Sequence, residues 1–141
     1  MLKSKKRSLL LFLTTVTGCW LACNSHDDAP KNAENALDAG REFVRASLDG
    51  NYKKAAFFLL EDSTNQNLLT RWEESYRNLS SDDREAFRRA SITINSEEEV
   101  SDSVSIINFS NSYKKKPQVL KVIKRDGTWK VDFKYTFSGN L

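Results

Sequence analysis

LKVIKRDGTWKVDFKYTF, residues 120–137, is the stretch that decides the fold of this 141-residue chain. Asp126-Gly127 at its centre is a preferred pair for a two-residue hairpin turn, because both central residues of such a turn need positive φ. Apolar pairs and an ionic pair then agree on one register, which starts from Arg125 opposite Thr128. The pairs that follow are Val122 with Val131, Leu120 with Phe133, and Lys121 with Asp132. The sequence therefore predicts an antiparallel hairpin in this register.

The second arm of this hairpin alternates over residues 129–137, which predicts one strand with a single apolar side. That side carries Trp129, Val131, Phe133, Tyr135 and Phe137. The same period of two predicts strands around Ile92 and Ile94 and over residues 104–109. Within residues 104–109 the apolar parity switches, which indicates either a bulge or a strand buried on both faces.

Before the strands, residues 33–90 carry apolar side chains at spacings of three and four, the pattern of amphipathic helices. Gly40 leaves a small-residue gap in the first helix. This helix should end at Asp49-Gly50, because glycine readily adopts the left-handed conformation that follows a helix. Asn51 is then placed to cap a short second helix.

Two further helices complete this half of the chain. Ser63 with Gln66 has the spacing of a capping box and predicts the start of a third helix, and Ser80 starts a fourth. Helices that precede an antiparallel sheet define the α+β class. We therefore expect N-terminal helices packed on one face of an antiparallel sheet of about four strands.

Residues 1–22 have the pattern of a lipoprotein signal peptide, with a basic head, an apolar run and small residues before a cysteine. The apolar stretch 8–22 has 15 residues, whereas a helix that spans a membrane needs about 20. Two cysteines resemble the lipidated cysteine of bacterial lipoproteins. Cys19 has valine three positions upstream, as is usual, but only Cys23 is followed by an abrupt switch to polar residues. We favour Cys23 for lipid attachment, with Cys19 as the alternative and secretion without a lipid as another reading.

Residues 23–32 then form a polar tether, and residues 33–141 form the folded domain. The chain has 22 basic and 19 acidic residues, but residues 1–22 contain four of the basic ones, which leaves 18 against 19. A nearly neutral mature protein argues against nucleic acid as a partner. The sequence thus predicts a protein anchored by its N-terminal lipid in the cell envelope of a Gram-negative bacterium, facing the periplasm or the cell surface.

Three features of the domain resemble a known family. They are the segment FVRASLDGNYKKA at residues 43–55, the helix order up to Ala90, and the closing DGTWKVD at residues 126–132. Together they are similar to the nuclear-transport-factor-2-like superfamily, and closest to the lumazine-binding-like bacterial lipoproteins of domain-of-unknown-function family 4878. The resemblance spans about residues 33–137 and implies N-terminal helices packed into the concavity of a curved, cone-like antiparallel sheet. Its motifs are turns and packing positions, so it implies a fold rather than an activity.

The predicted domain lacks the residues that catalysis and metal binding use most often. His26 is the only histidine and lies in the tether, and both cysteines lie in the export region. We therefore expect no catalytic residue, no metal and no cofactor. Residues 97–102 are interpreted as an acidic solvated loop. The lysines of residues 114–134 are interpreted as solvating the sheet, with anionic headgroups or an acidic envelope protein as alternative partners.

Aromatic side chains remain as candidates for a binding site. In a cone they can line a pocket between helices and sheet, and the predicted wall consists of Trp72, Tyr76, Trp129 and Tyr135. We expect a non-catalytic module that binds a small apolar ligand or an envelope protein. The alternative is a small-molecule isomerase or hydrolase that uses Asp or Glu with Tyr in the cone pocket. A homodimer through the exposed sheet is a further possibility.

Overall fold

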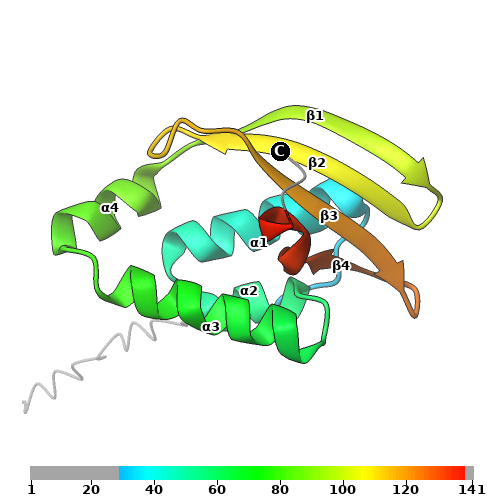
Figure 1. Cartoon of the computed structure of the whole chain (residues 1–141), viewed down its shortest axis with the longest axis horizontal. Coiled ribbons are helices and arrows are strands. Elements are labelled where there is room, and N and C mark those ends of the chain that lie inside the picture. Colours follow the sequence, from blue (N-terminus) through cyan, green and yellow to red (C-terminus); the bar gives the residue numbers. More distant parts are fainter. Residues whose placement is uncertain (1–28, 139–141) are drawn as a thin grey trace, which may run out of the picture.

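The structure is a computed structural model of the chain, and it describes residues 29–138. The predicted signal peptide, both cysteines and the first part of the tether lie outside the described residues. Four helices precede four strands and a closing 3₁₀ turn (Figure 1). The helices are α1 (Ala36–Asp49), α2 (Tyr52–Phe58), α3 (Ser63–Arg77) and α4 (Ser81–Arg89). The strands are β1 (Ile92–Ser101), β2 (Val104–Asn111), β3 (Gln118–Arg125) and β4 (Thr128–Asp132), followed by η1 (Phe133–Phe137).

The strands form one open antiparallel sheet in the order β1-β2-β3-β4, so the described part of the chain is an α+β domain, as the sequence predicts. Helix α1 crosses the sheet and contacts all four strands, while α2 packs on α1 and also contacts β4. Helix α3 packs on α2 and on η1. The largest fully buried side chains of this arrangement are Phe43, Phe133, Ile107, Leu120, Val122, Val131 and Asn65.

Glycines permit two close approaches in this core. A Cβ at Gly40 would lie 2.8 Å from Cδ1 of Ile107, so the predicted small-residue gap lets α1 approach β2. Gly50 ends α1 with φ 75°, and a Cβ there would lie 2.5 Å from the ring of Tyr76. Gly50 therefore combines the left-handed helix end expected from the sequence with space for a buried tyrosine.

Two of the predicted helix starts are confirmed and one is wrong by a residue. The side chain of Asn51 accepts a hydrogen bond from the backbone N–H of Lys54, and Ser80 caps α4 in the same way. Helix α3 is capped by Asp62 rather than by Ser63. Both residue types suit this position, but Asp62 is fixed there by a 2.7 Å ion pair with Lys134, which sequence spacing does not show.

The predicted hairpin register is confirmed from Arg125–Thr128 to Lys121–Asp132. The prediction that this strand continues to Phe137 is wrong, because β4 ends at Asp132 and the chain turns into η1. Phe133 therefore leaves the predicted pairing with Leu120 and becomes fully buried against α1 and α3, with its ring 5.1 Å from Phe43. The predicted ionic pair is also wrong, since the carboxylate of Asp132 pairs with Lys134, 3.3 Å away.

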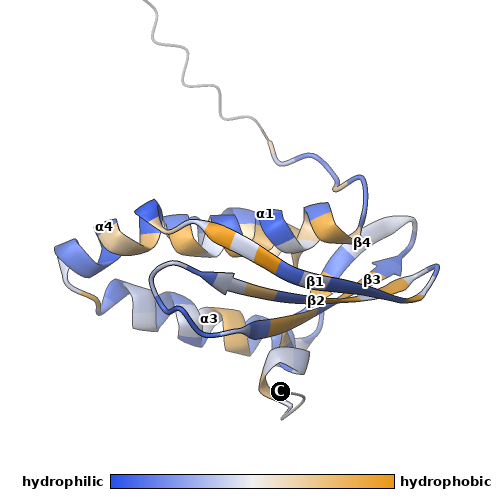
Figure 2. Ribbon diagram, turned by 90° about the horizontal axis from the view of Figure 1, so that it is seen from above, coloured by the Kyte–Doolittle hydropathy of each residue, from blue (hydrophilic) through white to orange (hydrophobic). Residues whose placement is uncertain are grey.

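The pairing and burial of strands β1 and β2 explain why the apolar parity switches within residues 104–109. β2 pairs with β3 without interruption and alternates buried with half-buried residues, so it is covered on both faces. The register shifts lie in β1, at Ile94/Ser96 and Glu99/Ser101. The acidic residues Glu97–Glu99 belong to this strand rather than to a loop, although they are exposed as expected. Figure 2 shows the change along β1 from an apolar start to a hydrophilic second half.

Candidate functional site

The four aromatic residues predicted to form one pocket wall occupy different places. The Trp72 ring stacks on Phe133 with centroids 4.8 Å apart and an angle of 21° between the rings. Tyr76 is buried edge-on against Tyr52, and Trp129 lies in β4. Tyr135 lies in η1 below the ammonium of Lys121. Trp72 and Trp129 line two different surface grooves, and Tyr76 and Tyr135 line neither of these two.

The Trp72 groove is a hollow of about 330 Å³ between α3, the β2–β3 turn and η1. Its lining residues are Leu68, Arg71, Trp72, Ser75, Lys114, Gln118 and Phe137. Phe137 is 60% exposed although its ring lies 5.1 Å from that of Phe133. An exposed phenyl ring beside a half-buried tryptophan gives this groove an apolar floor that a bound molecule could cover.

Two cations face this floor from different elements. Arg71 belongs to α3, and the Nζ of Lys114 lies 5.5 Å from the Trp72 ring and 5.9 Å from the Phe87 ring. Among the ion pairs of the described residues, neither cation has a carboxylate partner. The Trp72 groove therefore carries uncompensated positive charge next to aromatic surface.

Hydrogen bonds fix the turn that carries Lys114. The side-chain oxygen of Asn111 accepts from the backbone N–H groups of Tyr113 and Lys114, at 3.2 and 2.8 Å. The hydroxyl of Tyr113 donates to Asp83 of α4 at 2.9 Å. Hydrogen bonds from Ser80 and then Tyr113 lower the pKa of Asp83, so this anchor is ionised at neutral pH. The turn thus presents Lys114 from a fixed backbone.

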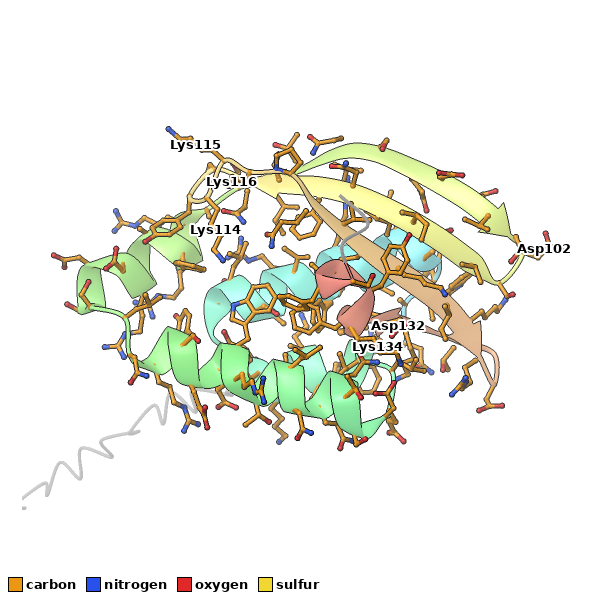
Figure 3. All side chains as sticks on the ribbon, in the orientation of Figure 1. Asp102, Lys114, Lys115, Lys116, Asp132 and Lys134 are labelled. Atoms are coloured by element: carbon orange, nitrogen blue, oxygen red, sulfur yellow. The ribbon has the colours of Figure 1, made fainter. Side chains whose placement is uncertain are left out.

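The Trp129 groove lies near the other end of the sheet and has a volume of about 420 Å³. Its lining residues are Asn35, Ala36, Leu37, Glu97, Glu99, Ser101, Asp102, Ser105 and Trp129. Figure 3 shows Asp102 and the Lys114–Lys116 turn at opposite ends of the molecule. A lysine lies over the tryptophan here too, with the Nζ of Lys124 5.5 Å from the ring, but the rim is acidic.

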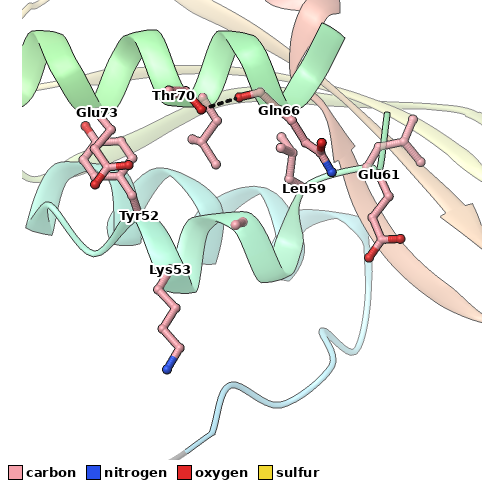
Figure 4. A pocket seen from close by; sticks show the side chains of 10 residues that line it. Tyr52, Lys53, Leu59, Glu61, Gln66, Thr70 and Glu73 are labelled. Carbon is pink, nitrogen blue, oxygen red and sulfur yellow. Dashed lines mark hydrogen bonds between the residues drawn. The ribbon is translucent and has the colours of Figure 1, made fainter. Parts of the chain in front are cut away.

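A third groove, between α2 and α3, has a volume of about 630 Å³ (Figure 4). Tyr52 and Glu73 lie at one end of it, and Gln66 and Glu61 lie at the other. Burial, and then the neighbouring Tyr76 and Glu73, raise the pKa of the Tyr52 hydroxyl, which therefore stays protonated. This hydroxyl donates a hydrogen bond to the backbone carbonyl of Trp72, 3.5 Å away.

A buried polar network, which the sequence did not predict, joins α3 to the end of β4. The amide nitrogen of Asn65 donates to Asp62 at 2.8 Å and to Asp132 at 3.1 Å, and its oxygen accepts from the backbone N–H of Lys134 at 2.7 Å. The hydrogen bond from the Lys134 ammonium lowers the pKa of Asp62. Figure 3 shows Asp132 and Lys134 side by side. Asp132, the one buried carboxylate in the described region, is thus held by structural partners and lines none of the three grooves.

The described residues contain no cluster of histidine, cysteine or carboxylate side chains that could hold a metal ion. None of the helices in residues 29–138 is both long and apolar enough to cross a membrane. Fold and grooves together define an α+β domain with surface sites of opposite charge. Comparison of the chain with protein-family models, with curated proteins and with solved structures gives no match.

Proposed function

We propose that this chain is an exported, lipid-anchored envelope protein whose nuclear-transport-factor-2-like domain binds a small ligand without transforming it. The order of four helices before an antiparallel sheet supports the proposed domain family. The leader-like residues 1–22 support the proposed export. Phe43, Phe133 and Ile107 fill the space between α1 and the sheet. The ligand therefore binds in a groove at the surface rather than inside the cone.

The Trp72 groove is the observation that carries this proposal. It combines an exposed phenyl ring, a half-buried tryptophan and two cations without carboxylate partners. Such a mixture of apolar wall and a few polar groups is typical of ligand sites. The predicted wall residue Trp72 keeps this role in the proposal, whereas Trp129 belongs to a different groove.

Native mass spectrometry of the protein isolated from cells tests this assignment. We expect an added mass that disappears on denaturation and is lost in Phe137→Ala. Val100→Ala is the matched control, because Val100 is 56% exposed and lies on β1, outside the groove. A ligand that Phe137→Ala retains, or one lost equally in both variants, would show that the Trp72 groove is not the site.

The anchor is tested separately by metabolic labelling with a fatty acid. We expect Cys23→Ser to abolish label and to release the protein from the membrane fraction, while Cys19→Ser retains both. The reverse result would make Cys19 the attachment site. Label in neither wild type nor variant would favour secretion without a lipid.

One arrangement favours the enzymatic alternative enough to be tested. Tyr52 and Glu73 line the same α2–α3 groove, which gives a carboxylate next to a protonated phenol. Glu73 also forms an ion pair with Arg77 one turn further along α3. We expect Glu73→Gln to leave the binding of any copurifying ligand unchanged. Turnover of that ligand by wild type, and its loss in Glu73→Gln, would establish catalysis instead.

A further inference from the structure

We propose that the Trp72 groove recognises an amphipathic anion, a small molecule that joins an apolar body to a carboxylate or phosphate group. This inference rests on the proposed function, because it names the chemistry of the ligand that the groove binds. It follows from how the apolar and the cationic side chains of the groove are arranged.

The apolar part of the site is a corner formed by two rings. Trp72 stacks on the buried Phe133, Phe137 meets Phe133 edge-on at 79°, and both Trp72 and Phe137 line the groove. Both rings are thereby oriented by one buried phenylalanine. A flat ring or a short chain placed in this corner would cover Phe137, whose ring is otherwise largely in water.

The charged part of the site comes from the two sides of that corner. Arg71 is next to Trp72 in α3, and Lys114 reaches over the Trp72 ring from the β2–β3 turn. Because neither has a carboxylate partner in residues 29–138, an anion would meet two available cations without displacing an ion pair. An arginine can bind carboxylate or phosphate through two parallel hydrogen bonds, and a lysine adds a point charge.

The charged residues around the groove favour a ligand with a negative charge. Lys115 and Lys116 continue the positive charge along the same turn (Figure 3). Asp83, the carboxylate that contacts this turn, already accepts hydrogen bonds from Ser80 and Tyr113. The volume of about 330 Å³ is at the small end of ligand pockets and fits one ring or a short chain rather than a whole lipid.

Two probes of opposite charge test this proposal by fluorine NMR. They are 4-(trifluoromethyl)phenylacetate and 4-(trifluoromethyl)benzylammonium, which share the ring and differ in the charge. The protein isolated from cells is placed in zwitterionic phosphatidylcholine nanodiscs, so that the anchor is kept without adding anionic lipid. We expect saturable binding of the anion and at least tenfold weaker binding of the cation.

Matched variants locate the binding. We expect Lys114→Gln to weaken the anion about tenfold, as for loss of one charge-assisted contact. Lys124→Gln is the control, because its Nζ lies at the same 5.5 Å from a tryptophan ring in the acidic groove, and it should change affinity less than twofold. Phe137→Ala should weaken both probes.

The outcomes separate this inference from the proposed function. If both probes bind equally and only Phe137→Ala weakens them, the groove binds apolar molecules and the recognition of an anion is wrong. If the anion does not bind wild type at millimolar concentration, the inference is also wrong, while the copurifying mass still decides the proposed function. Phosphatidylglycerol added to the nanodiscs then identifies the source of the anion: displacement of the probe indicates a lipid headgroup, and no displacement indicates a soluble ligand.

Discussion

The two tryptophan grooves differ in one respect that matters for binding. In each, a lysine ammonium lies 5.5 Å from the tryptophan ring, so the local pair is the same. Other elements supply the rim, which is cationic around Trp72 and acidic around Trp129. The aromatic residue therefore marks a place where a molecule can bind, while side chains from distant segments determine which charge it should carry.

The largest expected difference between the grooves concerns stability. Trp72 stacks on the fully buried Phe133, whereas Trp129 lies on the edge strand β4. We expect Trp72→Ala to lower the free energy of unfolding by about 3 kcal/mol and Trp129→Ala by about 1 kcal/mol. Urea denaturation of the two variants measures this. Equal losses would mean that both tryptophans belong to the core to the same degree.

The buried polar side chains beside the two grooves should also differ in how much they contribute to stability. Asn111 is buried and accepts two backbone hydrogen bonds from the turn of the Trp72 groove, so Asn111→Ala should cost about 1–2 kcal/mol. The hydroxyl of Ser105, which is equally buried beside the Trp129 groove, makes no such bond to a described residue. We expect Ser105→Ala to change stability by less than about 0.5 kcal/mol. Thermal unfolding at fixed pH compares the two, and a costly Ser105→Ala would reveal a support that the contacts do not show.

A smaller expected effect is the pH dependence of stability that comes from Asp83, which contacts the turn of the Trp72 groove. The pKa of Asp83 is lower in the folded chain, so its contribution to stability is present above the ordinary aspartate range and is lost as the pH falls through the lowered value. We expect Tyr113→Phe to move this pKa back up toward its usual range, because one of the hydrogen bonds that lower it is removed. Carbon NMR titration of the Asp83 carboxyl measures this pKa directly. An unchanged midpoint would show that the turn is held without Tyr113.

The smallest effect is expected at the acidic rim. Glu97 and Glu99 lie two residues apart on the same face of β1 and are exposed. Replacing either by glutamine should stabilise the domain by a few tenths of a kcal/mol at low salt, and 1 M salt should remove the gain. Destabilisation by these variants would mean that the carboxylates have an attractive partner rather than a repulsive one.

The sequence predicts those parts of the fold that neighbouring residues determine. Gly50, Asn51 and Ser80 mark helix ends by their own conformational preferences, and the Asp126-Gly127 turn carries its strand register with it. The end of β4 is not predictable in this way. The aromatic residues that follow Asp132 continue the alternation of a strand, but Asn65 accepts a hydrogen bond from the N–H of Lys134 and keeps the chain in η1.

In the candidate site, too, only the features that neighbouring residues determine can be predicted from the sequence. Aromatic composition points to Trp72 but also to Tyr76 and Tyr135, which lie outside the Trp72 groove. The residues that give this groove its charge, Arg71 and Lys114, are separated by more than forty positions and meet only because α3 and the β2–β3 turn do. Periodicity gives no information about such pairs, since it describes one element at a time.

The two edges of the sheet have a consequence for crowded conditions. Leu60 donates a hydrogen bond to the carbonyl of Val131 and closes the β4 edge, whereas no described segment pairs with the outer edge of β1. At high local concentration, two copies could pair through their β1 edges into one continuous sheet, which would end there because Leu60 covers the β4 edge of each copy. Glu97–Glu99 would place like charges next to each other in such a pair, so we expect the acidic strand to oppose self-assembly. We therefore expect the charge that shapes one groove also to keep neighbouring molecules apart.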